Sequence, residues 1–300
     1  MDDARARPPL GGATVPGSRH GLTGSDSAAP ATRRRVWLLL ATSLLMVAVA
    51  AIVPPVSQDP AYHVFADART VLHVPNFLNV ASNLPILLVG ALGLAFLSRD
   101  RPTGERETVV TPGTRHPYWL FFTGSALTGV GSAYYHWRPD NATLFWDRLP
   151  MTIAFMALLA SVIGERISRR AGPRCLWPLL IAGAASTLYW HLGEQRGAGD
   201  LRPYGLVQFG SMVLVPLILV LFPARYTGTR CLWMSIGWYG LAKVVEYFDH
   251  GLFVRVGVSG HTWKHLASAV AAYWILRMLE ERRPLTPETR QDDDSAARDP

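Results

Sequence analysis

The chain contains the stretch Gly131-Ser132-Ala133-Tyr134-Tyr135-His136, followed by Asp147-Arg148-Leu149-Pro150-Met151. These two pieces lie at the facing ends of two strongly apolar segments. A third piece, His261-Thr262-Trp263-Lys264-His265, opens the last apolar segment. Charged and metal-binding side chains are costly in hydrocarbon, so their presence in such segments indicates a functional site.

The composition indicates an integral membrane protein. Of the 300 residues, 49% are hydrophobic and only 17% are charged, whereas a soluble domain usually carries about 25% charged residues. The net charge of +7 does not indicate nucleic-acid binding, because the basic residues are scattered between apolar runs and form no basic stripe. All but two of the 29 basic residues are Arg, which favours a bacterial source.

Eight apolar segments of about 20 residues each have the length that crosses a bilayer. They are residues 36–54, 76–97, 117–137, 143–163, 174–192, 203–223, 231–250 and 259–279. The sequence therefore predicts an all-α integral membrane protein, a seven-transmembrane-helix bundle with one additional N-terminal transmembrane helix. Its predicted parts are a disordered cytoplasmic tail (1–34), the additional helix (35–56), a seven-span domain (60–279) and a second disordered cytoplasmic tail (280–300).

The distribution of Arg and Lys predicts the orientation. With this set of spans, 21 basic residues fall on the side of the two termini and five on the opposite side. Cytoplasmic segments carry the excess of positive charge, so both termini are predicted to be cytoplasmic. The predicted location is the bacterial inner membrane.

The unusual polar residues of the spans gather on the outer side in this topology. The three quoted pieces lie there, and so do polar residues at the outer ends of the other spans: Asn76, Asn79, Ser82, Asn83, His191, Glu194, Asp200, Arg202, Tyr204, Gln208, Lys243, Glu246, Asp249 and His250. This one-sided concentration predicts a water-accessible cavity that opens outward, with the active site on that side.

The histidine spacing predicts a metal site. His261 and His265 are four residues apart, so they share one face of a helix and can bind one ion. His136 would be the third ligand, which leaves one position open, as expected of a catalytic zinc. Asp147 could act as general base and then return the proton to a leaving amine. Ser132, one turn from His136, could hydrogen-bond a developing oxyanion or orient the water.

Simpler interpretations exist for each residue alone. An intramembrane His often forms a hydrogen bond between helices, and Ser132 could be a small residue at a helix contact. The metal prediction depends on all five residues lying at one membrane depth. A polar stripe of Lys243, Glu246, Asp249 and His250 could bind a headgroup, support the metal ligands, or form a buried ion-pair cluster.

The pattern G-S-x-x-x-H, then D-x-L-P-M, with a late H-x-x-x-H helix, resembles the alkaline ceramidases. These belong to a superfamily of seven-span membrane hydrolases that includes the adiponectin-receptor-like proteins. The resemblance covers residues 60–279. It implies zinc ligands His136, His261 and His265, a proton-transfer role for Asp147 and transition-state stabilisation by Ser132.

The reaction that the resemblance implies is hydrolysis of an N-acyl sphingoid amide, such as ceramide, to a fatty acid and a sphingoid base. The implied partner is a membrane lipid substrate, and the sequence does not indicate an oligomeric state. Animal and yeast members carry an acidic calcium site before their first span. Residues 62–76 offer only Asp67 and Asn76 as such donors, and calcium takes six to eight oxygens, so the sequence does not predict a calcium site.

Other functions are compatible with the sequence. A lipid hydrolase could act on an acyl ester or a different amide with the same residues. A transporter could use the Lys243–His250 stripe as a proton relay, although no internal repeat of the kind common in transporters is found. A non-catalytic lipid receptor could keep zinc structurally, with Ser132 and Asp147 far from a closed metal shell.

Overall fold

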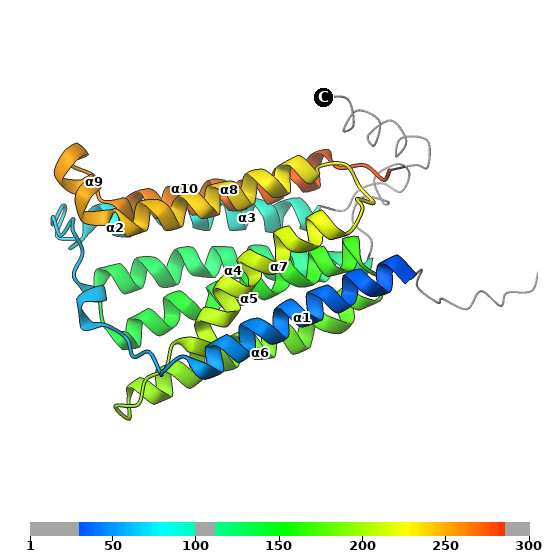
Figure 1. Ribbon diagram of the computed structural model, residues 1–300. Coiled ribbons are helices and arrows are strands. Elements are labelled where there is room, and N and C mark those ends of the chain that lie inside the picture. The colour runs from blue at the N-terminus through cyan, green and yellow to red at the C-terminus, as the bar shows by residue number, and fades with distance from the viewer. Residues whose placement is uncertain (1–29, 100–111, 286–300) are drawn as a thin grey trace, which may run out of the picture.

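The computed structural model describes residues 30–99 and 112–285, and within these ranges the regular structure is helical (Figure 1). The elements are α1 (Pro30–Ile52), the 3-10 helix η1 (Pro60–His63), α2 (Phe77–Ala81), α3 (Leu84–Ser98), α4 (Pro112–Trp137), α5 (Asn141–Arg166), α6 (Ala171–Glu194), α7 (Arg202–Leu221), α8 (Thr229–Tyr247), α9 (Asp249–Val256) and α10 (Gly260–Glu281). The predicted all-α class is confirmed.

Five helical segments are long and apolar enough to cross a membrane. They are Ala31–Ile52, Phe77–Ser98, Asn141–Arg166, Ala171–Glu194 and Arg202–Leu221, that is, α1, α2 with α3, α5, α6 and α7. This identifies an integral membrane protein. The long helices α4, α8 and α10 run alongside them in the same bundle (Figure 1) and carry more polar residues.

Helices α4 and α5 pack so closely that a side chain cannot fit between them at Gly131. A Cβ there would overlap the backbone of Trp146 and lie 3.3 Å from the amide nitrogen of Asp147. Pro150 lies inside α5 and has no N–H to donate to the carbonyl of Trp146, four residues earlier. The carbonyl oxygen that Pro150 leaves without this helix hydrogen bond therefore lies against Gly131 of the other motif.

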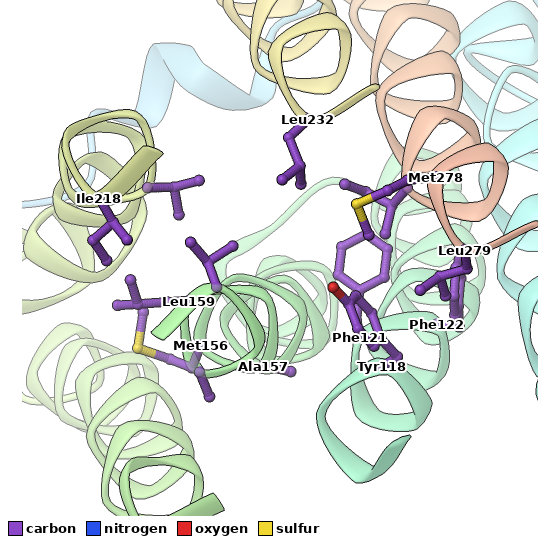
Figure 2. Close-up of a cluster of buried hydrophobic side chains, with 14 of the residues drawn as sticks. Tyr118, Phe121, Phe122, Met156, Ala157, Leu159, Ile218, Leu232, Met278 and Leu279 are labelled. Carbon is purple, nitrogen blue, oxygen red and sulfur yellow. The ribbon is translucent and has the colours of Figure 1, made fainter. Parts of the chain in front are cut away.

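A hydrophobic core fills the half of the bundle in which α1 begins and α10 ends, and the opposite end of the bundle is called the outer end. Its fully or almost fully buried members come from α4, α5, α7 and α10, as Figure 2 shows: Tyr118, Phe122, Ala157, Ile218, Met278 and Leu279. A smaller cluster at the outer end contains Phe65, Tyr135, Leu144 and Trp190. The larger core thus packs the helices together at one end of the bundle, and the smaller cluster does so at the other.

The additional helix α1 lies on the outside of the bundle against α7 (Figure 1). Arg202 fastens its outer end, because one guanidinium nitrogen donates to the carbonyl oxygens of Ala50 (3.2 Å) and Val53 (2.5 Å). The same guanidinium forms an ion pair with Asp200 at 2.8 Å. Its hydrogen bonds hold the pKa of Asp200 below the usual value, so this pairing stabilises the fold at neutral pH and is lost as the pH falls.

Part of each segment predicted as a tail is folded. Residues 1–29 and 286–300 lie outside the described residues, but α1 already begins at Pro30 and the chain is ordered through Leu285. Arg282, which the prediction assigned to a disordered tail, is only 2% exposed and forms an ion pair with Glu165. Its guanidinium also lies over the rings of Tyr118 and Tyr226. This ion pair holds the residues that follow α10 against the bundle.

The polar stripe predicted along one helix is interrupted. Helix α8 ends at Tyr247, Phe248 lies outside regular helix geometry, and Asp249 begins the separate helix α9. Lys243 and Glu246 therefore face the bundle, whereas the side chain of His250 is exposed. The prediction that these four residues form a stripe on one helical face is therefore wrong.

We expect Gly131→Ala to destabilise the protein by about 1–3 kcal/mol, because the added Cβ forces α4 and α5 apart. Thermal unfolding of the detergent-solubilised protein measures this effect. Gly237→Ala is the matched control, since that glycine is helical and exposed with nothing within 4 Å of a new Cβ. Equal unfolding temperatures for the two variants would contradict the close α4–α5 contact.

We expect Arg282→Gln to cost about 3–5 kcal/mol, because it leaves the Glu165 carboxylate buried without its cation. The neighbouring Arg283 is exposed, so Arg283→Gln serves as control and should change the unfolding free energy by less than about 0.5 kcal/mol. If both variants unfold like the unsubstituted protein, the inference that the Arg282–Glu165 ion pair stabilises the fold is refuted.

Candidate metal centre

Three histidines, one from α4 and two from α10, converge at the outer end of the bundle. His136 lies in the last turn of α4, and His261 and His265 lie one turn apart at the start of α10. All three are at most 5% exposed, and one ring nitrogen of each lies within 4.8 Å of the others. The structure therefore brings together the three predicted ligands as a group that could hold a metal ion.

The geometry suits a tetrahedral ion. Two nitrogens bound at about 2.1 Å to such an ion stand ~3.4 Å apart. The Nε2 atoms of His136 and His261 are 3.2 Å apart. These two rings are therefore already spaced as a bound ion requires.

Hydrogen bonding fixes which nitrogen His265 offers. The Ser82 hydroxyl donates its only proton to the carbonyl oxygen of Asn79, so it accepts from Nδ1–H of His265 at 2.8 Å. Nε2 is then the unprotonated nitrogen of this neutral ring. It is buried and has no hydrogen-bond partner among the described residues. An unpaired buried lone pair beside two other imidazoles is what a metal ligand presents.

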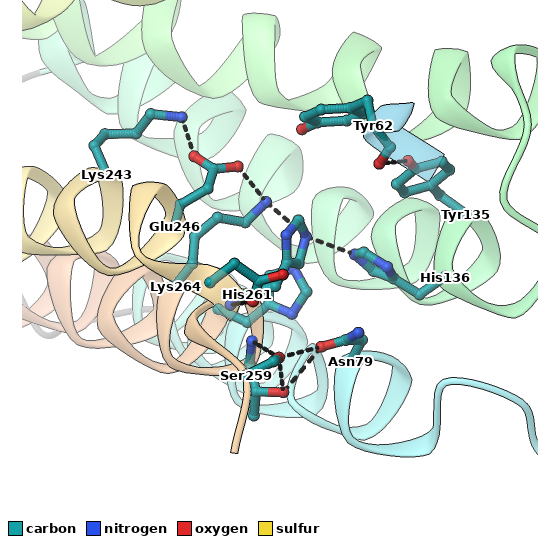
Figure 3. Close-up of polar contacts among 12 residues, drawn as sticks. Tyr62, Asn79, Tyr135, His136, Lys243, Glu246, Ser259, His261 and Lys264 are labelled. Atoms are coloured by element: carbon teal, nitrogen blue, oxygen red, sulfur yellow. Dashed lines mark hydrogen bonds and ion pairs between the residues drawn. The ribbon is translucent and has the colours of Figure 1, made fainter. Parts of the chain in front are cut away.

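The start of α10 is held in place by side chains from neighbouring elements, as Figure 3 shows. The side-chain oxygen of Asn79 accepts hydrogen bonds from the Ser259 hydroxyl at 3.0 Å and the Thr262 hydroxyl at 2.9 Å. Ser259 also caps the helix by accepting from the backbone N–H of Thr262, and Asp249 accepts from the N–H of His261 at 2.8 Å. These bonds fix the positions of both α10 histidines.

An outer loop covers the histidines. The ring of Phe65, only 7% exposed, lies 4.6 Å from the ring of His136 and 5.4 Å from that of His261, centroid to centroid. Asn76 donates to the backbone carbonyl oxygen of His136 at 2.8 Å. The loop therefore both shields the imidazoles and holds the end of α4.

A chain of polar contacts runs from the histidines into the bundle. The Lys264 ammonium donates to Nε2 of His261 at 2.9 Å and pairs with Glu246 at 3.0 Å, and Glu246 also pairs with Lys243 (Figure 3). An ion bound by the three histidines would take the His261 lone pair. Glu246 is then the partner to which the Lys264 ammonium remains bound.

Ser132 and Asp147 face each other next to this group. Ser132 is one turn before His136 on α4, and its hydroxyl interacts with the Asp147 carboxylate on α5. Both are almost completely buried. Their proximity follows from the close α4–α5 contact at Gly131 and Trp146.

Two cavities meet at Asp147. The inner one, about 170 Å³, is mostly apolar and is also lined by Ser132, His265 and residues such as Phe121 and Val215. The outer one, about 460 Å³, is lined by apolar residues such as Leu201 and Phe209 and by six charged side chains: Asp147, Arg148, Arg202, Lys243, Glu246 and Lys264. Five residues line both cavities: Asp147, Met151, Tyr239, Lys264 and Ser268. The site thus has an apolar side and a charged side.

Both residues considered as calcium ligands contact other parts of the protein. The Asp67 carboxylate pairs with Arg69, whose hydrogen bonds hold the pKa of Asp67 below its usual value. The Asn76 amide donates to the backbone of His136. The Asp67 carboxylate thus already has a cationic partner, and the Asn76 contact uses its amide nitrogen and not its side-chain oxygen.

Two residues of the site, Lys264 and Ser82, were not predicted from the sequence as site residues. Lys264 lies three residues after His261, on the same helical face, so the helical spacing that paired the histidines could also have found it. Ser82 was recognised only as one of several outer polar residues. Its bond to His265 joins segments 183 residues apart and has no local signal.

No known protein family matches the chain, and no curated protein matches it. Function is therefore inferred from the site itself.

We expect the purified protein to contain about one equivalent of a divalent transition metal, and His265→Ala to lose most of it, because only two imidazoles remain. Elemental analysis by inductively coupled plasma mass spectrometry measures both. His250→Ala, which removes an exposed imidazole from the neighbouring helix, should keep full occupancy. Full occupancy in His265→Ala would refute the ligand set.

Proposed function

We propose that this protein is a zinc-dependent membrane hydrolase that cleaves the amide bond of ceramide or a related N-acyl lipid. The products are a fatty acid and a sphingoid base or similar amine. The observation that carries the proposal is the group of three buried histidines, one of which, His265, lines the apolar cavity together with Ser132 and Asp147. Three nitrogen ligands and an open position are typical of catalytic zinc.

The proposed membrane arrangement is a seven-span bundle formed by α2 with α3, α4, α5, α6, α7, α8 and α10, with α1 as the additional span. Parallel alignment of these helices supports it (Figure 1). The excess of basic residues lies at the end of the bundle opposite the three histidines. This distribution supports cytoplasmic termini and an active site on the outer side of a bacterial inner membrane.

The proposed reaction forms a bond between the carbonyl carbon and a water oxygen and breaks the carbon–nitrogen bond. When a zinc ion is bound, its chemistry is polarisation of the carbonyl and activation of the water. Asp147 accepts a proton from the attacking water and delivers it to the leaving nitrogen. Ser132 donates a hydrogen bond to the carbonyl oxygen as negative charge develops there.

The same residues would serve a lipid ester or another amide, and a substrate panel separates these possibilities. A receptor with purely structural zinc would have Ser132 and Asp147 far from the metal. Instead Ser132, Asp147 and His265 line one cavity, which favours a catalytic role.

We expect Asp147→Asn to reduce amide hydrolysis at least about a hundredfold, because the amide side chain cannot accept the water proton. Its metal content should stay at one equivalent, since Asp147 is outside the three-histidine group. Mass spectrometry of the fatty acid released from a panel of N-acyl lipids and acyl esters measures turnover. A fully active Asp147→Asn protein would overturn the proposed role.

A further inference from the structure

Arg148 is a buried cation without an anionic partner. Its side chain comes directly after Asp147 on α5 and is 6% exposed. Within residues 30–99 and 112–285, no carboxylate forms an ion pair with it, and its Nη1 atom has no hydrogen-bond partner. Burying a guanidinium in this way is costly unless an opposite charge joins it.

The guanidinium is held in a preformed setting. It lies over the rings of Trp190, Tyr204 and Tyr62, with the central carbon 4.3, 4.8 and 5.6 Å from the ring centroids. Its other terminal nitrogen, Nη2, donates to the Gln58 side chain at 2.7 Å. Stacking on aromatic rings leaves the edge of the guanidinium free for hydrogen bonds.

A second contact network fixes this setting. Glu194 accepts a hydrogen bond from the backbone N–H of Gln58 at 2.7 Å and one from the Trp190 indole at 3.2 Å. The carboxylate thus organises the groups around Arg148 without pairing with it. Arg148 is therefore positioned but left unneutralised.

The cavity that Arg148 lines has an excess of positive charge. Lys243 and Lys264 share a single counterion, Glu246. Together with Arg148 and Asp147, the outer cavity holds three cations against two carboxylates, apart from Arg202, which Asp200 neutralises. One further negative charge would balance it.

We propose that the amine portion of the substrate carries an anionic group, a carboxylate or an equivalent oxyanion, that binds Arg148 in the outer cavity. The acyl chain then occupies the inner apolar cavity, and the amide lies between them beside Asp147. This inference rests on the proposed amide hydrolase and names its substrate class, an anionic N-acyl lipid. Guanidinium–oxyanion hydrogen bonds are among the strongest that proteins form.

Two substrates that differ only in the head group test the proposal. N-palmitoylglycine and N-palmitoylethanolamine share the acyl chain, the amide and a two-carbon amine, and only the first carries a carboxylate. We expect the zinc-loaded protein, in neutral detergent, to favour N-palmitoylglycine at least about tenfold in kcat/KM. In Arg148→Gln this ratio should fall toward one, while Arg138→Gln, at an exposed site on the same side, should keep it.

A binding measurement separates this proposal from the hydrolase proposal and does not need a folded Arg148 variant. Zinc-loaded Asp147→Asn protein should bind N-palmitoylglycine at least about tenfold more tightly than N-palmitoylethanolamine. Equal binding, or an unsubstituted enzyme that hydrolyses both equally well, would overturn the anionic site and leave the hydrolase standing. Selective binding without hydrolysis of any amide would overturn the hydrolase and leave the anionic site.

Discussion

The close contact between α4 and α5 at Gly131 is the constraint on which the candidate site depends. Pro150 removes the hydrogen bond that the Trp146 carbonyl would otherwise accept within α5. That carbonyl instead lies where a side chain at residue 131 would stand. Ser132 and Asp147, the next residue on each helix, are thereby brought together. Gly131 and Pro150 therefore act at the same contact, because the proline frees the Trp146 carbonyl and the glycine leaves room for it.

The histidine group illustrates how a membrane bundle can keep polar side chains buried. Each buried imidazole must satisfy its ring nitrogens, because water is scarce in such a site. Ser82 bonds Nδ1 of His265, and the buried Nε2 is left without a hydrogen-bond partner beside His136 and His261. Asn79, which orients Ser82 through its carbonyl oxygen, also holds the start of α10 through its side chain. The short helix α2 and its C-cap residue Ser82 therefore set both the position and the protonation of His265.

Much of this arrangement could be predicted from the sequence because helices impose a simple spacing rule. The H-x-x-x-H pair and the position of His136 near a span end were enough to place three ligands at one depth. Hydropathy was less informative for α4, α8 and α10, since the polar residues that form the site lower the apolar character of those helices. The break at Phe248 and the burial of Arg282 could not be read locally. Each depends on partners far away in sequence, such as Glu165 for Arg282.

The two cavities assign different physical tasks to the two sides of the Asp147 carboxylate. On the inner side, apolar residues of α4, α5, α7, α8 and α10 leave space that favours hydrocarbon. On the outer side, unbalanced cations favour an anion. In the proposed hydrolysis, the bond at the junction joins an apolar part to a polar part, which is the composition of an acylated amine. Asp147 is the carboxylate that lines both cavities, so under this proposal it is the group placed to pass a proton from the water to the leaving amine.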